Sequence, residues 1–279
     1  MKMQMKYLEH IEKGIAHLQG REVSEQTLGL LQSGLGSREA CLRGIASSCA
    51  AQALLAWFQS KNLEGMKSWA FLAAKATRMV AQGEPGAWWP AYIHLYPLLS
   101  EQSDIIDWFS KNHVSYYLKD EIDDRDNPRE DAFHGFQALL ALRGKWSELE
   151  ARSLEAIHDE KTAGSKFLVD YRFYLALARR DVEGMENALE ELAGPLAPKR
   201  NFEHAFGLTQ NLIATHAVIY SKIAFRWGHT LRIRSSWVPS NWLPVNPLKE
   251  YDQGWNFMAD FDIWEPFAPP WTEWSPKKG

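Results

Sequence analysis

The chain has 279 residues, a net charge of −4 at neutral pH, 46% hydrophobic residues and 24% charged residues. This composition is typical of a globular protein, and the mild acidic balance argues against a general nucleic-acid binder, which usually carries a basic stripe. The sequence contains no secretory h-region and no apolar run of about 18 residues. We therefore expect a cytoplasmic protein that does not associate with a membrane.

The first 82 residues predict four helices. Apolar residues recur at helical spacing over 5–19, and Ser24 has the chemistry of an N-cap for a second, short helix. A longer helix is expected over 37–60, with residues 63–82 returning antiparallel to it. The middle of the 37–60 helix is rich in small residues, which let a neighbouring helix approach closely, so we expect it to be central.

The two cysteines, Cys41 and Cys49, lie on this long helix. Eight residues of helix span about 12 Å, which is too far for a disulfide. We expect both to be small core residues, as is usual in a reducing compartment.

Residues 83–127 show a less regular apolar pattern. A Gly/Pro break at 83–86 precedes Trp88 and Trp89, which either pack in the core or contact a partner. Pro97 lies inside the next helical pattern and should kink or shorten that helix. Ser103 is placed to begin another short helix.

The stretch 127–194 predicts two consecutive helical hairpins. In each, apolar residues at three- and four-residue steps stop at a polar break, first at 143–145 and then at 179–181. The two units superpose with a shift of about 36 residues, close to the roughly 34-residue period of tetratricopeptide arrays. A weaker copy lies upstream, where the turn at 61–62 precedes Leu-Glu-Gly-Met, which resembles the Val-Glu-Gly-Met after the 179–181 break.

The predicted fold class is therefore all-α, a tetratricopeptide-like stack of antiparallel helical hairpins, with an irregular helical bundle as the alternative. Residues 1–228 would form the helical-hairpin domain. Within it, 201–227 reads as one long helix that ends at Gly228, with these core contacts: Phe202, Phe206, Leu212, Ile213, Ala217, Tyr220, Ala224 and Trp227.

Residues 229–279 differ in composition from the rest of the chain. They hold seven of the thirteen prolines and six of the thirteen tryptophans, so neither a regular helix nor a central sheet strand is expected. A brief alternation over 231–235 is compatible with one extended strand. We expect an extended Pro/Trp-rich arm that packs on the helical domain through its aromatic side chains.

The sequence shows no motif for catalysis, cofactor binding or metal binding. Its nine histidines are dispersed, and it has no HExxH, no Cys-x-x-Cys, no G-x-S-x-G and no phosphate-binding loop. His10 and His17 share a predicted helix face but have no obvious third ligand. We therefore expect no catalytic residues, no cofactor and no metal.

The most concentrated charged feature is an acidic segment between residues 120 and 131. One interpretation is a solvated loop that leads into a helix N-terminus, where acidic residues are favoured by the helix dipole. The other is a docking patch for a basic partner surface, with two neighbouring tyrosines as anchors. The candidate partner-binding residues are Asp120, Glu121, Asp123, Asp124, Asp126, Tyr116 and Tyr117.

Three stretches together resemble the Imm49-type immunity proteins of bacterial polymorphic toxin systems. They are the Asp-Arg-Asp-Asn-Pro junction at 124–128, the repeated helix-turn-helix spacing through Leu192, and the long helix end with its proline-bracketed arm over 224–251. The resemblance spans about residues 40–255. It does not extend to the aromatic end from Trp255 to Trp274, and it carries over no set of toxin-contacting residues.

The resemblance implies a cytoplasmic, non-enzymatic antidote that binds and occludes a cognate toxin in interbacterial competition. The partner would be that toxin, and the acidic segment predicts that its surface is basic. The chain itself is expected to bind no nucleic acid directly. The alternative is a tetratricopeptide-like adaptor or regulator that binds a peptide or protein in its concave face.

Overall fold

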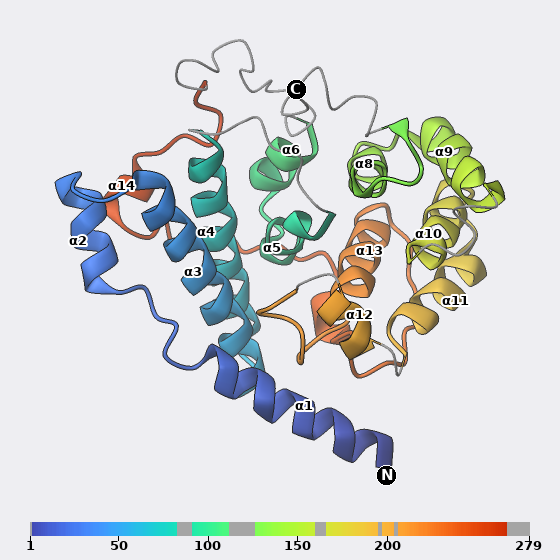
Figure 1. Ribbon diagram of the computed structural model, residues 1–279, viewed down its shortest axis with the longest axis horizontal. Helices are drawn as coiled ribbons and strands as arrows, with labels where there is room; N and C mark the ends of the chain where they lie inside the picture. The colour runs from blue at the N-terminus through green and yellow to red at the C-terminus, as the bar shows by residue number, and fades with distance from the viewer. Residues whose placement is uncertain are drawn as a thin grey trace.

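The computed structural model describes residues 2–82, 91–111, 126–159, 166–194, 197–203 and 206–266. These residues form thirteen α-helices and two short 3-10 helices, and no β-strand occurs among them (Figure 1). The all-α prediction is therefore confirmed.

The helices of the first part of the chain follow the predicted order. Ser24 Oγ accepts a hydrogen bond from the Thr27 amide (3.1 Å), which caps the second helix as expected. Both cysteines are buried and free. Pro97 lies in a helix of only six residues, as its position predicted. The elements are α1 Lys2–Leu18, α2 Glu25–Ser33, α3 Arg38–Ser60, α4 Leu63–Ala81, η1 Ala91–His94, α5 Leu95–Ser100 and α6 Ser103–Lys111.

The second part contains the two predicted hairpins, with their turns at the expected breaks. The first is the pair α8 and α9, and the second is the pair α10 and α11. The elements are α8 Asp131–Leu142, α9 Trp146–His158, α10 Leu168–Ala178, α11 Val182–Leu192, α12 Ala197–Glu203, α13 Thr215–Arg226, η4 Ser240–Trp242 and α14 Asn256–Ala259.

The repeated Glu-Gly-Met motif is a helix-capping device. Asn62 and Asp181 each accept a hydrogen bond from the amide of the glycine three residues later, at 2.9 and 3.0 Å. A Cβ on Gly65 or Gly184 would lie 2.4 Å from the capping side chain, so glycine lets the cap approach. The methionine that follows each glycine is fully buried.

The three similar hairpins do not form one continuous array. Helices α8 to α11 follow one another on one side of the molecule, with α10 packed against both α9 and α11 (Figure 1). The α3–α4 hairpin lies on the other side, and its contacts run from α4 to α5, from α5 to α13 and from α13 to α11. The stack of repeats thus extends over two adjacent hairpins, and the third packs through intervening helices.

The prediction of one long helix over 201–227 is wrong. The chain leaves α12 at Glu203 and re-enters a helix at Thr215. The buried Asn201 amide group donates to the carbonyls of Gln210 and Ile213, and its oxygen accepts from the Thr215 amide, so one side chain holds the intervening turns. Phe202 is 70% exposed and Trp227 is 44% exposed, which also corrects their assignment to the core.

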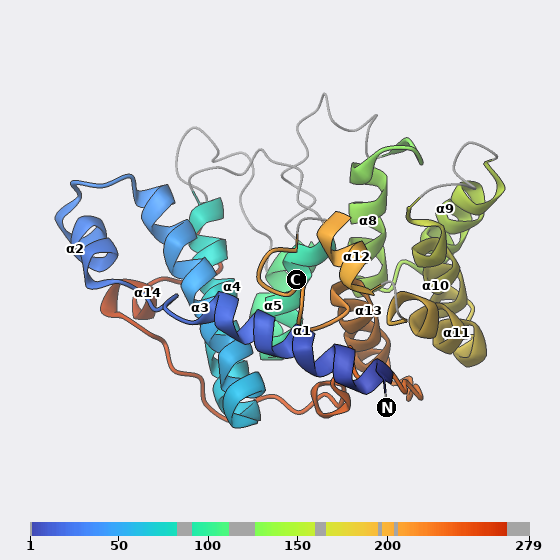
Figure 2. The same ribbon diagram turned by 60° about the horizontal axis from the view of Figure 1, so that its bottom comes forward.

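Residues 229–266 run along the helices without regular secondary structure apart from η4 and α14 (Figure 2). The stretch 231–235 is not a strand, because its backbone pairs with side chains. The amides of Arg232 and Arg234 donate to Glu186 and Glu190 of α11, at 2.7 and 2.9 Å. An extended segment without a neighbouring strand must satisfy its backbone groups in another way, and the helix carboxylates do so here.

Helix α4 provides cations, and its C-cap residue Gln82 provides an amide, along the later part of this segment. Lys75 Nζ donates to Gln253 Oε1 (2.9 Å), and the buried Arg78 guanidinium donates to the carbonyls of Ile263 and Glu265 (2.8 and 2.7 Å). Gln82 donates to the Pro266 carbonyl. The segment is therefore bound by buried polar groups spaced along one helix.

Among the described helices, α3 alone is long and apolar enough to cross a membrane by length and composition. Over half of its most apolar window (56%) is buried inside the protein, as is usual for the central helix of a folded domain.

Candidate functional site

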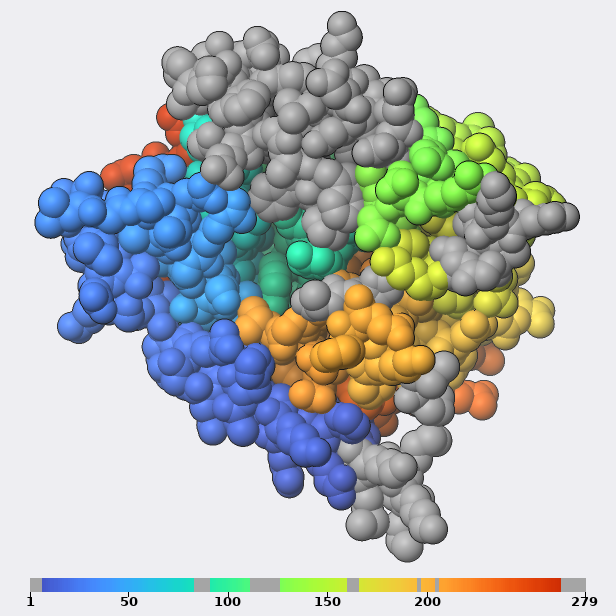
Figure 3. Space-filling model, in the orientation of Figure 1, coloured from blue at the N-terminus to red at the C-terminus, as the bar shows by residue number. Residues whose placement is uncertain are grey.

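A cavity of about 350 Å³ opens between α1, α3, η1 with α5, and the turns after residue 206. Figure 3 shows the surface hollowed at this place, with the teal residues of η1 and α5 at its base. The lining is largely apolar and aromatic. The described residues that line it are His17, Arg21, Ser47, Tyr92, Leu95, Tyr96, Phe206, Gly207, Leu208, Thr209 and Thr215.

The cavity has an aromatic wall and a hydroxyl pair. The rings of Tyr92 and Phe206 meet edge to face with centroids 5.2 Å apart. The hydroxyls of Thr209 and Thr215 lie 2.7 Å from each other. An apolar concave site with a few convergent polar groups is the usual form of a small-molecule site.

The basic groups at the cavity are His17 of α1 and Arg21, which lies just after the end of that helix. The Arg21 Nε donates to the His17 carbonyl (3.0 Å), and a terminal guanidinium nitrogen lies 3.4 Å from His17 Nε2. Arg21 forms no ion pair with any described carboxylate. The cavity therefore carries positive charge beside an apolar interior.

A buried polar cluster lies behind the cavity wall. Phe206 contacts the His216 ring (4.9 Å between centroids), and His216 faces Arg200 of α12 and Asp170 of α10. Asp170 Oδ2 accepts from Arg200 (2.6 Å), and Oδ1 accepts from the Tyr220 hydroxyl (2.5 Å). Burial raises the pKa of the Asp170 carboxyl, and the Arg200 guanidinium and the Tyr220 hydroxyl oppose that rise.

This cluster has the composition of a metal site but not the chemistry of one. The nearest ligand atoms of His134, Asp170 and His216 all lie within 4.8 Å of one another. Both Asp170 oxygens are already bonded, and His216 Nδ1 accepts from Arg200 Nε (3.2 Å). The guanidinium supplies the positive charge that a metal ion would bring, so a cation does not fit beside it. The cluster joins α8, α10, α12 and α13.

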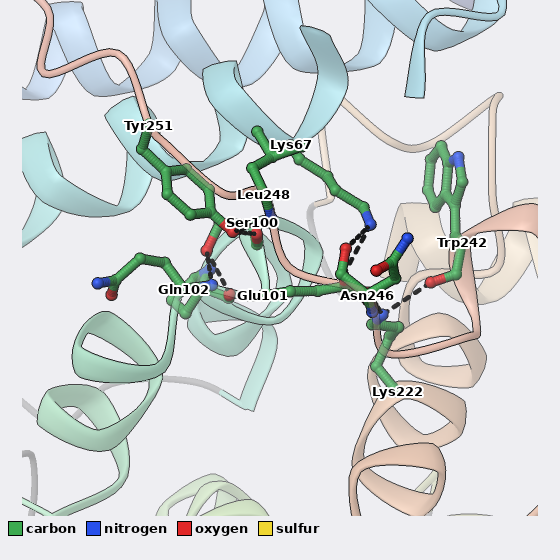
Figure 4. A network of polar contacts seen from close by, with 10 residues as sticks. Lys67, Ser100, Glu101, Gln102, Lys222, Trp242, Asn246, Leu248 and Tyr251 are labelled. Atoms are coloured by element: carbon green, nitrogen blue, oxygen red, sulfur yellow. Dashed lines mark hydrogen bonds and ion pairs between the residues drawn. The ribbon is translucent and has the colours of Figure 1, made fainter. Parts of the chain in front are cut away.

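A second buried network centres on Glu101, at the end of α5 (Figure 4). Its carboxylate lies between the ammonium groups of Lys67 (2.7 Å) and Lys222, and it also accepts the Asn246 amide (2.8 Å). Lys222 donates in addition to the Trp242 carbonyl (2.7 Å). Burial lowers the pKa of Lys222 to about 8, against the opposing attraction of Glu101.

Of the seven predicted partner-binding residues, Asp126 alone lies in the described part of the chain. Its carboxylate forms an ion pair with Arg152 of α9 (2.8 Å). The Arg152 guanidinium lies over the Phe133 ring at 4.0 Å. Asp126 therefore has a structural partner within the protein. The remaining six fall outside the described residues: Tyr116, Tyr117, Asp120, Glu121, Asp123 and Asp124.

The histidines that share the face of α1 do not form a common site with each other. His10 Nδ1 bonds Asn211 Oδ1 (3.0 Å) and its ring contacts Trp237, whereas His17 lies beside Arg21. The cavity and both buried networks were missed from sequence. Their members come from helices far apart in the chain, and none forms a local motif.

Comparison with protein-family models, with curated proteins and with solved structures finds no match for this chain.

Proposed function

We propose that this protein is a non-catalytic binding protein, an immunity protein that neutralises a cognate antibacterial toxin by occluding it. The observation that supports a binding role most directly is that the buried charged groups are bonded to one another and to the backbone. In the described residues, the Asp170 cluster and the Glu101 network are each buried and bonded internally. Their charges hold helices and the extended segment in place.

Such internal networks favour a rigid scaffold. The Asp170 cluster fixes α10 relative to α12 and α13, and the Glu101 network fixes α4, α5, α13 and the segment around Asn246. A preorganised surface loses little conformational entropy on association, which benefits a tight stoichiometric inhibitor. The resemblance to Imm49-type proteins supports the same conclusion about class.

The proposed partner surface is formed by the acidic segment from Asp120 to Asp126 together with the neighbouring Tyr116 and Tyr117. A toxin that acts on nucleic acids or nucleotides needs a basic cleft for phosphates, and carboxylates on an antidote complement that potential. Complementary charge acts mainly on the association rate, while anchors that become buried on binding supply affinity, a role that we assign to Tyr116 and Tyr117. Asp126 is assigned a second role, because it already neutralises Arg152.

The experiment pairs the purified protein with the toxin candidate encoded beside its gene. Growth rescue and one-to-one binding are measured for the wild type and for a variant with Asp120, Glu121, Asp123 and Asp124 changed to the corresponding amides. The variant should associate more slowly, with a weaker salt dependence and an unchanged melting curve. Asp126→Asn is the matched control, which should lower thermal stability and leave the association rate nearly unchanged. Full toxin activity at saturating protein would refute the proposal.

A second candidate, a peptide-binding adaptor, is favoured by one feature of the repeat region. A groove of about 260 Å³ lies between α10 and α11, with Arg172, Arg179 and Asn187 in its lining. Asn187→Trp would fill this groove without touching the acidic segment. Loss of partner binding in this variant, together with intact binding in the acidic-segment variant, would favour the adaptor.

A further inference from the structure

We propose that the cavity between α1, α3 and α5 binds a small amphipathic carboxylate, with an aromatic or aliphatic body inside and its carboxylate on Arg21. The inference rests on the cavity alone and is independent of the proposed toxin partner.

The interior suits an apolar, flat body. Leu95 is almost fully buried at the cavity, and Tyr92, Tyr96 and Phe206 provide aromatic surface around it. The edge-to-face pair of Tyr92 and Phe206 leaves ring surface on which a further ring can pack. A volume of about 350 Å³ lies at the small end of the usual range for ligand pockets.

The charge at the cavity suits a single carboxylate. Arg21 forms no ion pair with the described acids. Its Nε is taken by the His17 carbonyl, and its two terminal nitrogens keep N–H donors that a carboxylate can accept in a bidentate arrangement. His17 Nε2 lies 3.4 Å from a terminal nitrogen of the Arg21 guanidinium and helps to hold that side chain beside the cavity. An apolar wall with one arginine favours a monoanion, since a phosphate group would leave more oxygens without donors.

Two of the described hydroxyls that line the cavity are paired with each other. The Thr209 and Thr215 hydroxyls bond each other at 2.7 Å, and Thr209 also reaches the Phe206 carbonyl at 3.3 Å. A ligand with an apolar body therefore leaves their hydrogen bonds intact. This favours a body without polar substituents at that end.

The test uses isothermal titration calorimetry on the full chain with 4-phenylbutyrate as the probe and 4-phenylbutanamide as its neutral counterpart. The acid should bind measurably. The amide should bind roughly tenfold or more weakly, because it lacks the charge-assisted hydrogen bond to Arg21. Ring protons of the bound acid should show nuclear Overhauser contacts to Tyr92 and Phe206.

Three variants locate the site. Arg21→Gln should weaken the acid by roughly tenfold to a hundredfold and leave the amide unchanged. Ser47→Phe should fill the cavity from α3 and abolish binding of both probes. Arg143→Gln, an exposed arginine that does not line the cavity, is the matched control and should have no effect. Melting curves of all variants check that each remains folded.

The outcomes that overturn the proposal are distinct from failure of the toxin experiment. Absence of binding at millimolar acid would reject the site. Equal affinity for acid and amide, or equal affinity of wild type and Arg21→Gln, would reject the assignment of the carboxylate to Arg21. Binding that survives Ser47→Phe would place the probe elsewhere.

Discussion

Glu101 is a buried charge that bonds the extended segment to the helices. It is 2% exposed and lies between two buried ammonium groups, those of Lys67 and Lys222. Glu101→Gln keeps the shape and one acceptor oxygen but leaves both cations without their buried counter-charge. Breaking a buried ion pair in this way costs about 3–5 kcal/mol.

The lower end of this range is expected near neutral pH. Burial already lowers the pKa of Lys222 to about 8, so loss of Glu101 lets Lys222 release its proton and relieves part of the cost. We therefore predict a loss of about 3 kcal/mol in the free energy of unfolding. The loss should shrink between pH 7 and pH 9, as the folded variant carries less charge on Lys222.

The assay is urea unfolding followed by tryptophan fluorescence, with hydrogen exchange as a local readout. The Asn246 amide, which donates to Glu101 in the wild type, should exchange faster in the variant. Glu191→Gln is the matched control, because Glu191 and Arg172 form an ion pair with side chains about half exposed (56% and 50%). Such a pair contributes at most about 1 kcal/mol.

A double-mutant cycle with Lys222→Met tests the coupling. The combined variant should lose less stability than the sum of the two single changes, because neither member of the pair is then left alone. A shift of the unfolding midpoint by Glu101→Gln no larger than that by Glu191→Gln would show that the buried Glu101 charge is not required for stability.

Three further predictions concern the cap, a buried histidine and the extended segment. Gly184→Ala should cost about 1–2 kcal/mol in unfolding free energy. The new Cβ would lie 2.4 Å from the capping Asp181 and 2.9 Å from Ala176. Chemical denaturation measures this cost, and an unchanged midpoint would contradict the packing argument. Burial lowers the pKa of His94 to about 3 from 6.5, so its contribution to stability is present above pH 6.5 and is lost as the pH falls. Between pH 7.5 and pH 5.5, the wild type should lose about 1.4 kcal/mol more unfolding free energy than His94→Gln, measured in parallel melting curves. Equal losses would show that His94 does not titrate on unfolding. Truncation after Arg234 removes the buried Trp242 and the hydrogen-bond acceptors of three buried α4 side chains. The product should therefore be insoluble or melt at a far lower temperature. An unchanged melting temperature would show that the segment is dispensable.

The local features of the fold could be predicted from short stretches of sequence. The hairpin turns at 61–62, 143–145 and 179–181 were predicted because periodicity stops there, and the structure places left-handed residues at Lys61, Gly144 and Arg180. Cap residues such as Ser24 were predictable from their N-cap chemistry and their place before a helical pattern. Both kinds of signal act between residues a few positions apart, so they are written into short stretches of sequence.

The break between α12 and α13 could not be read in this way. Apolar periodicity continued through the break, and the decisive interactions come from the buried Asn201 amide, which bonds backbone groups nine to fourteen residues later. An alternation of residues likewise suggested a strand over 231–235, although Glu186 and Glu190 satisfy its backbone from a distant helix.

The candidate site belongs entirely to the tertiary structure. Arg21 and Phe206 meet at one cavity, and Asp170 meets Arg200 and Tyr220, only after helices distant in the chain have packed. The acidic segment is a concentrated charge in the sequence because its acidic residues are adjacent. In the structure, Asp126 is paired with Arg152, 26 residues away. Adjacency in the chain fixes which charges are concentrated, but burial and partners decide what each charge does, and both depend on packing between distant elements.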